Sequence, residues 1–247
     1  MKIQIVSFSL KHKLSRIRNI ADIINDSQSD LILFSGWAIV NDRDVEKLSE
    51  LIKNDKIVAV IEAKESQQYP FTIWDNALFL LKKGNITPMY THQFFANRED
   101  VSTYPELVPM LLQDLKTKRC FKVGDKRVMI LQCGETSILR NLQSEGNRAV
   151  FCLDDGKLKN DFEKLLRSVD IVLNPIHSPQ KGNQTKHKER RKVLSADGRA
   201  YLSVSNVNAE NFLDKSVHYV AIDGQEVKKE VGNMQSNKQY CCWIYEV

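Results

Sequence analysis

The chain has 247 residues, of which 42% are hydrophobic and 27% are charged, with a formal net charge of +5. This length and composition are sufficient for the core of one large α/β domain, so we expect a single domain over residues 1–247. They exclude the strongly basic composition typical of nucleic-acid-binding proteins, and no apolar run in the sequence is long enough for a membrane-spanning helix. Nucleic acid and membranes are therefore not expected partners.

The first half of the chain alternates between strand and helix patterns. Alternating or continuous apolar residues predict strands, whereas apolar residues three and four positions apart predict helices. In chain order, the sequence predicts strands at about 2–8, 30–34, 57–63 and 72–81, a short strand towards residue 90, and helices at about 14–25 and 45–52. Residues 91–120 are predicted to be irregular, apart from a short helix near 107–115.

The second half continues with more strands than helices. Strands are predicted at about 127–132, 149–153, 169–174, 200–206, 217–222 and 240–247, with a hairpin through residues 225–231 and helices at 137–142 and 158–166. The segment 181–192, KGNQTKHKERRK, is strongly basic and is predicted to be a loop that leads into a helix. A solvated face is the usual role of such a run, and a site for an anionic ligand is the alternative.

The segment from Arg127 to Glu135, RVMILQCGE, contains the first candidate for chemistry. Its apolar run predicts a strand buried on both faces, with Cys133 at the end. Gly134 permits a left-handed turn, and a helix beginning near Ile138 would place the thiol at a helix N-terminus, where a thiolate is favoured. The alternative is a buried structural cysteine, because free cysteines are among the most buried residues.

The other motifs indicate no bound group. The five cysteines, at positions 120, 133, 152, 241 and 242, have neither the spacing of a disulfide framework nor a CxxC metal pair. We find no zinc-ligand spacing and no glycine-rich phosphate loop, so neither a metal nor a cofactor is expected. The cysteine usage and the strand-like N-terminal segment predict a cytoplasmic protein.

Six blocks occur in an order that resembles the nitrilase superfamily of carbon-nitrogen hydrolases over almost the whole chain. The blocks are DLILFSG, WDNALFLLKKGNITPMYTH, RVMILQCGE, DIVLNPIHSP, RAYLSVSN and VAIDGQEV. The resemblance implies a four-layer αββα sandwich of two mixed β-sheets, commonly paired into dimers through helices. We therefore expect a homodimer if the helices at 137–142 and 158–166 carry exposed apolar stripes.

Catalysis in that family uses a glutamate as general base, a lysine that stabilises the oxyanion and a cysteine nucleophile. Cys133 matches the cysteine. The glutamate position falls at Gly36 and the lysine position at His92, so the resemblance leaves the base position empty and the cation replaced. Replacing Gly36 by Glu and His92 by Lys would rebuild the charge pattern of the family.

Three carboxylates remain as candidates for supporting roles. Glu99 could be the second carboxylate found in many members, Glu135 matches an acid in the nucleophile segment, and Glu62 ends a predicted strand. His177 lies at the end of another strand, where a substrate loop is expected, although a hydrogen-bonded structural histidine is the more frequent case.

Two functions remain open from the sequence. The first is a cysteine-dependent amidase or nitrilase in which Cys133 attacks an amide or nitrile carbon. The second is a degenerate relative that binds a small amide-like molecule or a protein. Loss of the base and of the oxyanion cation would each remove about 10²–10⁴-fold of rate, which favours the second for standard nitrilase chemistry.

Overall fold

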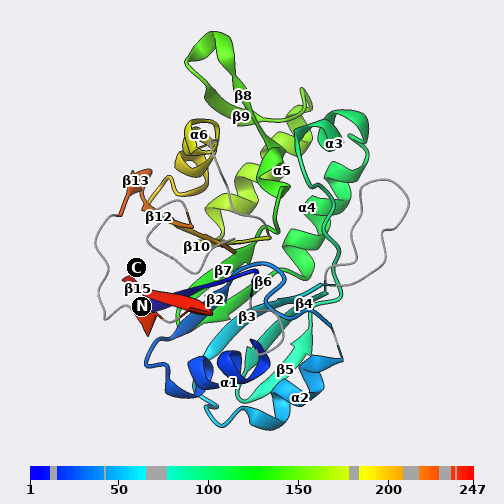
Figure 1. The fold of residues 1–247 in the computed structure, drawn as a ribbon. Helices are drawn as coiled ribbons and strands as arrows, with labels where there is room; N and C mark the ends of the chain where they lie inside the picture. Colours follow the sequence, from blue (N-terminus) through cyan, green and yellow to red (C-terminus); the bar gives the residue numbers. More distant parts are fainter. Residues whose placement is uncertain are drawn as a thin grey trace.

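The computed structural model describes residues 1–11, 16–41, 43–64, 77–177, 184–207, 217–227, 235–236 and 238–247. Two mixed β-sheets face each other, and helices cover the outer face of each sheet (Figure 1). The predicted four-layer αββα sandwich is therefore confirmed. The two chain ends lie side by side, where the N-terminal nitrogen donates to the carbonyl of Val247 at 2.8 Å.

The first sheet has a parallel centre, formed by β1, β2 and β3, and antiparallel edges. Helices α1 and α2 cover its outer face (Figure 1). In spatial order its strands are β14 (Gln235–Ser236), β15 (Tyr240–Glu246), β1 (Lys2–Phe8), β2 (Leu31–Phe34), β3 (Val58–Ala63), β4 (Ala77–Lys82) and β5 (Asn85–Pro88), and the helices are α1 (Arg16–Asp26) and α2 (Asp44–Leu51).

The second sheet also has a parallel centre, formed by β7, β10 and β11. Its strands are β13 (Gln225–Glu226), β12 (His218–Ile222), β11 (Ala200–Ser205), β10 (Ile171–Ile176), β7 (Lys126–Ile130) and β6 (Cys120–Val123), in that order. The elements on its outer side are α3 (Arg98–Thr103), α4 (Leu107–Thr117), α5 (Gly156–Arg167), α6 (Gln184–Leu194) and the hairpin of β8 (Leu139–Leu142) and β9 (Arg148–Phe151).

Apolar residues of the central strands are buried on both faces, which explains why these strands read as continuous apolar runs. In β2, Leu31 and Leu33 belong to the core between the two sheets, whereas Ile32 and Phe34 pack towards α1 and α2. A third core lies between the second sheet and helices α4 and α5. The helices therefore bury the apolar faces that the strands leave on the outside.

Two segments differ from the prediction. Residues 137–142 do not form a helix: Glu135–Ile138 is a single 3₁₀ turn, and Leu139–Leu142 forms β8. The pairing of β8 with β9 and the alternating burial of its side chains override the weak helical pattern. Residues 98–103 form α3 instead of an irregular loop, because Asn97 and Asp100 make a reciprocal capping box. The predicted strand residues 72–76 and hairpin residues 228–231 lie outside the described residues.

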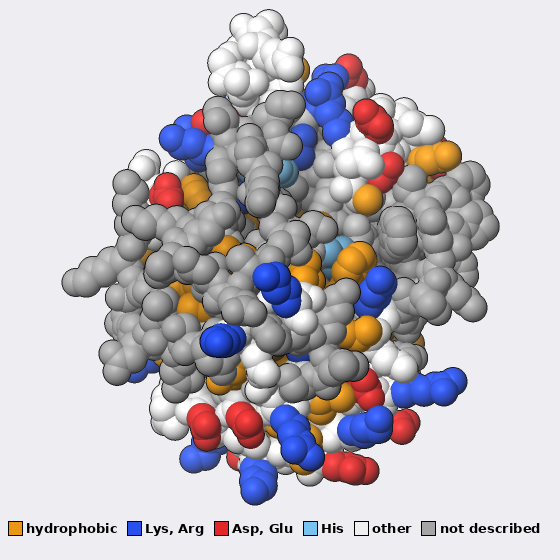
Figure 2. Space-filling view, viewed as in Figure 1, with side chains coloured by type: hydrophobic (Ala, Val, Ile, Leu, Met, Phe, Trp, Pro, Cys, Tyr) orange, Lys and Arg blue, Asp and Glu red, His pale blue; other side chains and the backbone are white. Residues whose placement is uncertain are grey.

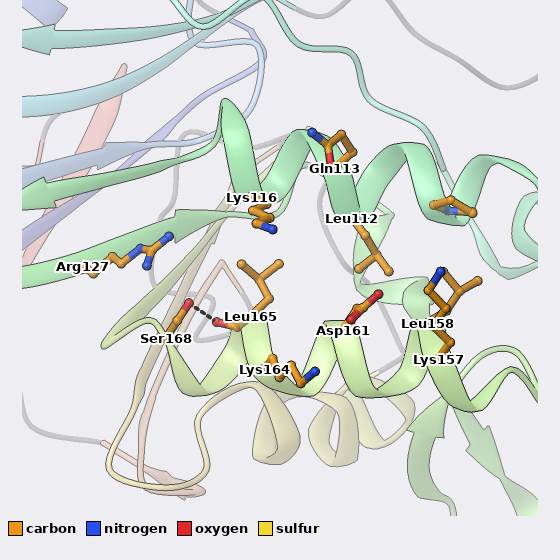
Figure 3. A pocket seen from close by; sticks show the side chains of 11 residues that line it. Leu112, Gln113, Lys116, Arg127, Lys157, Leu158, Asp161, Lys164, Leu165 and Ser168 are labelled. Carbon is orange, nitrogen blue, oxygen red and sulfur yellow. Dashed lines mark hydrogen bonds between the residues drawn. The ribbon is translucent and has the colours of Figure 1, made fainter.

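The homodimer was predicted on the condition that helices at 137–142 and 158–166 carry exposed apolar stripes. The structure does not show such stripes there. The first is not a helix, and the apolar face of α5, formed by Phe162, Leu165 and Leu166, is buried. Beside it, α4 and α5 border a cavity of about 520 Å³ into which Lys116 and Lys164 project (Figure 3). The homodimer stays a prediction.

Charged side chains of both signs are interspersed over the lower part of the molecule in Figure 2, where α1 and α2 lie. Among the residues described on this face, lysine and arginine are spread over several places. Within the described residues, none of the helices combines the length and the apolarity that a membrane crossing requires.

Candidate functional site

The candidate site lies where the carboxyl ends of parallel strands from both sheets meet. Cys133 follows β7, His177 follows β10, Glu62 lies near the end of β3, and Gly36 follows β2. Loops at the carboxyl ends of parallel strands share one edge of a sheet, which is the usual place for a ligand in α/β folds. Because the two sheets face each other, these four residues come together from distant parts of the chain.

The turn that carries Cys133 requires a glycine. Gly134 has φ +84°, and a Cβ atom there would lie 2.3 Å from the carbonyl oxygen of Ala96. The predicted left-handed turn is confirmed. Because only one 3₁₀ turn follows, the predicted helix N-terminus beside the thiol is wrong. Any stabilisation of a thiolate must come from neighbouring side chains.

The neighbour of Cys133 is the imidazole of His177. The Cys133 thiol is close enough to this ring to raise its pKa, and Nε2 of the ring lies 2.8 Å from Oε1 of Glu62. His177 and Glu62 are both buried, with 7% and 1% of their surface exposed. Burial by itself would lower the pKa of His177, but the Glu62 carboxylate and then Cys133 outweigh it and raise the pKa to about 10.

Surrounding groups fix the position of the imidazole. The Trp37 ring stacks on it, with centroids 4.1 Å apart and an interplanar angle of 10°. Asn206 donates to the backbone carbonyls of His177 and Gly36 at 2.8 and 2.7 Å. Gln132, which precedes Cys133, donates to Oε1 of Glu62 at 3.2 Å. The ring is held by packing and hydrogen bonds on several sides.

Gly36 makes room for this histidine. A Cβ atom at position 36 would lie 2.2 Å from Cδ2 of His177 and 2.8 Å from Oε2 of Glu62. The space next to Gly36 is therefore occupied by the imidazole, so the expectation that Gly36 leaves this position empty is corrected. It follows that Gly36→Glu cannot rebuild the charge pattern of the family without displacing His177.

We expect Gly36→Ala to destabilise the fold by about 1–3 kcal/mol, the usual range for overpacking a core. Differential scanning calorimetry measures this loss. Gly156→Ala is the matched control, because a Cβ atom on this first residue of α5 would meet nothing within 4 Å. Equal thermal stability of the two variants would contradict the crowding at Gly36.

Glu135 is part of a buried ion pair. Both side chains are fully buried, and Glu135 Oε2 lies 2.5 Å from Nη1 of Arg119. The same carboxylate accepts from the backbone amides of Phe94 and Gln132 at 2.9 and 2.8 Å. These contacts tie the turn after β7 to Phe94 in the segment before α3 and to Arg119 directly before β6, which supports a structural role for Glu135.

His92 lies between β5 and α3, and Glu99 lies in α3. The backbone carbonyl of His92 accepts a hydrogen bond from Arg119, and the His92 side chain is half-buried. Glu99 is exposed in the first turn of α3, where its amide donates to the Asn97 side chain at 2.7 Å. Of the candidates from the sequence, the structure brings Glu62 together with Cys133. It adds His177, for which the sequence favoured a structural role.

Cys133 opens into a cavity of about 330 Å³. Asn174, whose side chain donates to the carbonyls of Leu131 and Gln132, lines it beside the cysteine. Two arginines line the cavity as well, Arg98 from α3 and Arg190 from α6. Among the described residues, no Asp or Glu lines it, and no group of three potential metal ligands occurs.

Known proteins match this chain in structure but not in sequence. No protein family model matches the chain, and no curated protein matches it in sequence. Solved structures do match. An amidase from Nesterenkonia sp. has a TM-score of 0.56 at 10% identity, with 100% of this chain and 90% of the amidase covered. A CN-hydrolase superfamily protein from Xanthomonas campestris has a TM-score of 0.53 at 12% identity, with coverage of 100% and 90%.

A third structure shows the same fold inside a larger protein. The glutamine-dependent NAD(+) synthetase from Cytophaga hutchinsonii has a TM-score of 0.56 at 12% identity. The match covers 99% of this chain, which spans 42% of the synthetase. Identities this low establish the fold alone. The chain therefore has the carbon-nitrogen hydrolase fold that the resemblance to the nitrilase superfamily implies.

Proposed function

We propose that the protein is a cysteine-dependent hydrolase of amide C–N bonds in which Cys133, His177 and Glu62 act as a triad. The observation that carries this proposal is the buried His177–Glu62 contact of 2.8 Å next to a thiol that opens into a cavity. A nucleophile, a base and a group that orients the base are the three parts that acyl transfer requires.

In the proposed mechanism, His177 already holds the proton in the resting site, and the Cys133 sulfur attacks the amide carbon as a thiolate. The tetrahedral intermediate collapses when the C–N bond breaks, and His177 gives the proton to the leaving amine. The product of this step is a thioester on Cys133. A water molecule then loses a proton to His177 and attacks the thioester, which releases the acid and restores the Cys133 thiolate beside the protonated His177.

Glu62 has a positioning role in this scheme. Its Oε1 fixes the ring orientation through Nε2 and leaves the other ring nitrogen for proton exchange with the thiol. Glu62 Oε2 is buried and has no hydrogen bond to a protein group in the described part of the chain. A protonated His177 offsets the cost of burying this carboxylate.

A histidine thus takes the place that the family gives to glutamate. This replacement favours the hydrolase over the degenerate alternative, since the base that the sequence lacked at Gly36 is supplied by β10. A variant of the Nesterenkonia amidase carries the acetamide moiety of fluoroacetamide covalently at its active site cysteine. We propose the same kind of nucleophile for Cys133.

Alkylation with iodoacetamide near pH 7, followed by peptide mass spectrometry, tests the proposal. We expect Cys133 to react faster than a free thiol such as glutathione. The other cysteines provide internal controls, because burial raises the pKa of Cys152 to about 11 and that of Cys242 to about 12. A screen of simple amides, nitriles and N-carbamoyl compounds then measures turnover, and Cys133→Ala should abolish it.

The degenerate alternative predicts a different result. If Cys133 reacts no faster than glutathione and no compound is turned over, the proposed triad is wrong and the cavity serves binding only. A cytoplasmic location, a homodimer and the lack of nucleic-acid binding stay predictions.

A further inference from the structure

Arg190 is a buried cation. Only 8% of its surface is exposed, and among the described residues it forms no ion pair. Its Nε donates to Asn141 at 3.0 Å, and its Nη1 contacts the Ser137 hydroxyl at 3.4 Å. These two neutral groups orient the guanidinium but do not balance its charge. A buried, unpaired arginine is costly unless an anion joins it.

A second arginine faces the same space. Arg98 lines the cavity from the first turn of α3 and is exposed. Burial lowers the pKa of Arg190, and the positive charge of Arg98, which lines the same cavity, lowers it further. Two adjacent cations at the wall of a cavity whose described lining has no carboxylate form an unfavourable arrangement in the absence of an anion.

We propose that the substrate is a small amide whose acyl part carries an anionic group, held by Arg190 and Arg98 while its amide carbon meets Cys133. This inference rests on the proposed function and adds the substrate class. Guanidinium groups bind carboxylates and phosphates through paired N–H donors, so either anion fits this chemistry. The arginines come from α3 and α6, so the basic segment of the sequence contributes to the cavity as well as to the solvated surface.

Two alkylating reagents of similar size separate charge recognition from thiol reactivity. Iodoacetate is anionic and iodoacetamide is neutral. With both, the Cys133 sulfur bonds to the CH₂ carbon and iodide leaves. We expect the iodoacetate-to-iodoacetamide rate ratio to be higher at Cys133 than for glutathione. Arg190→Gln and Arg98→Glu should each lower this ratio about tenfold or more, as expected for the loss of a charge-assisted contact. Succinate and inorganic phosphate, added as competitors, distinguish the two anions by which one protects Cys133.

The controls keep the outcomes distinct. Lys47→Glu makes the same charge change as Arg98→Glu at an exposed residue of α2 and should leave the ratio unchanged. If Arg190→Gln fails to fold, the exposed Arg98 still provides the test. Fast iodoacetamide labelling with a ratio equal to that of glutathione would overturn the anion inference and leave the proposed hydrolase intact. Slow labelling by both reagents would overturn the hydrolase and the substrate class together.

Discussion

Replacement of His177 by glutamine should reduce the turnover of a cysteine-dependent amide substrate by about 10²–10⁴-fold, the usual contribution of a general base and acid. Glutamine retains a polar group of moderate size but cannot exchange a proton with the Cys133 thiol. Steady-state kinetics measure this loss, and alkylation of Cys133 by iodoacetamide should slow in parallel. Glu62→Gln should slow both reactions as well, because it removes the charge that orients the imidazole and keeps it protonated.

The pH dependence of stability tests the shifted pKa of His177. The pKa of His177 is raised from 6.5 to about 10 in the folded protein. The folded state therefore binds the proton more tightly than the unfolded state, and the resulting stability is fully present below pH 6.5 and lost as the pH rises through about 10. Urea unfolding at several pH values should show this decline in the native protein. The decline should be smaller in His177→Gln, and an unchanged profile would contradict the assignment.

Replacement of Arg119 by methionine should lower the free energy of unfolding by about 3–5 kcal/mol, because it leaves the Glu135 carboxylate buried without its cation. Both side chains of this pair are fully buried. The arginine also donates to Thr91 Oγ1 at 2.7 Å and to the backbone carbonyl of His92. The segment of Thr91 and His92 and the turn that holds Glu135 would thus lose a shared partner. Urea or guanidinium unfolding followed by circular dichroism measures the change.

An exposed pair provides the control for this prediction. Arg148 and Glu145 lie 2.5 Å apart, as close as the buried pair, but their side chains are 60% and 48% exposed. Arg148→Met should therefore cost no more than about 1 kcal/mol. A similar loss of stability in both variants would show that burial of the Arg119–Glu135 pair does not determine its effect.

Strand and helix patterns by themselves determined most of the architecture. The central strands are buried on both faces, so their apolar runs are nearly continuous and easy to recognise, as in β2 and β10. The αββα sandwich followed from the resemblance of six sequence blocks to the nitrilase superfamily, which these strands carry. Prediction was wrong at residues 137–142, where a long-range pairing with β9 decides the conformation of a short segment that local propensity specifies only weakly.

Cys133 was a candidate from the sequence because a cysteine followed by glycine at the end of an apolar strand places a thiol at a turn where chemistry is possible. The partners of Cys133 were decided only by the tertiary structure. Glu62 and His177 are 115 positions apart in the chain, and they meet because β3 and β10 lie in opposite sheets whose strand ends converge. The sequence could not predict that His177 packs against Gly36. A glycine shows only that a side chain is missing, and it does not show which distant ring fills the space. Local sequence determines where a strand ends. The packing of the two sheets face to face determines which residues meet at those strand ends.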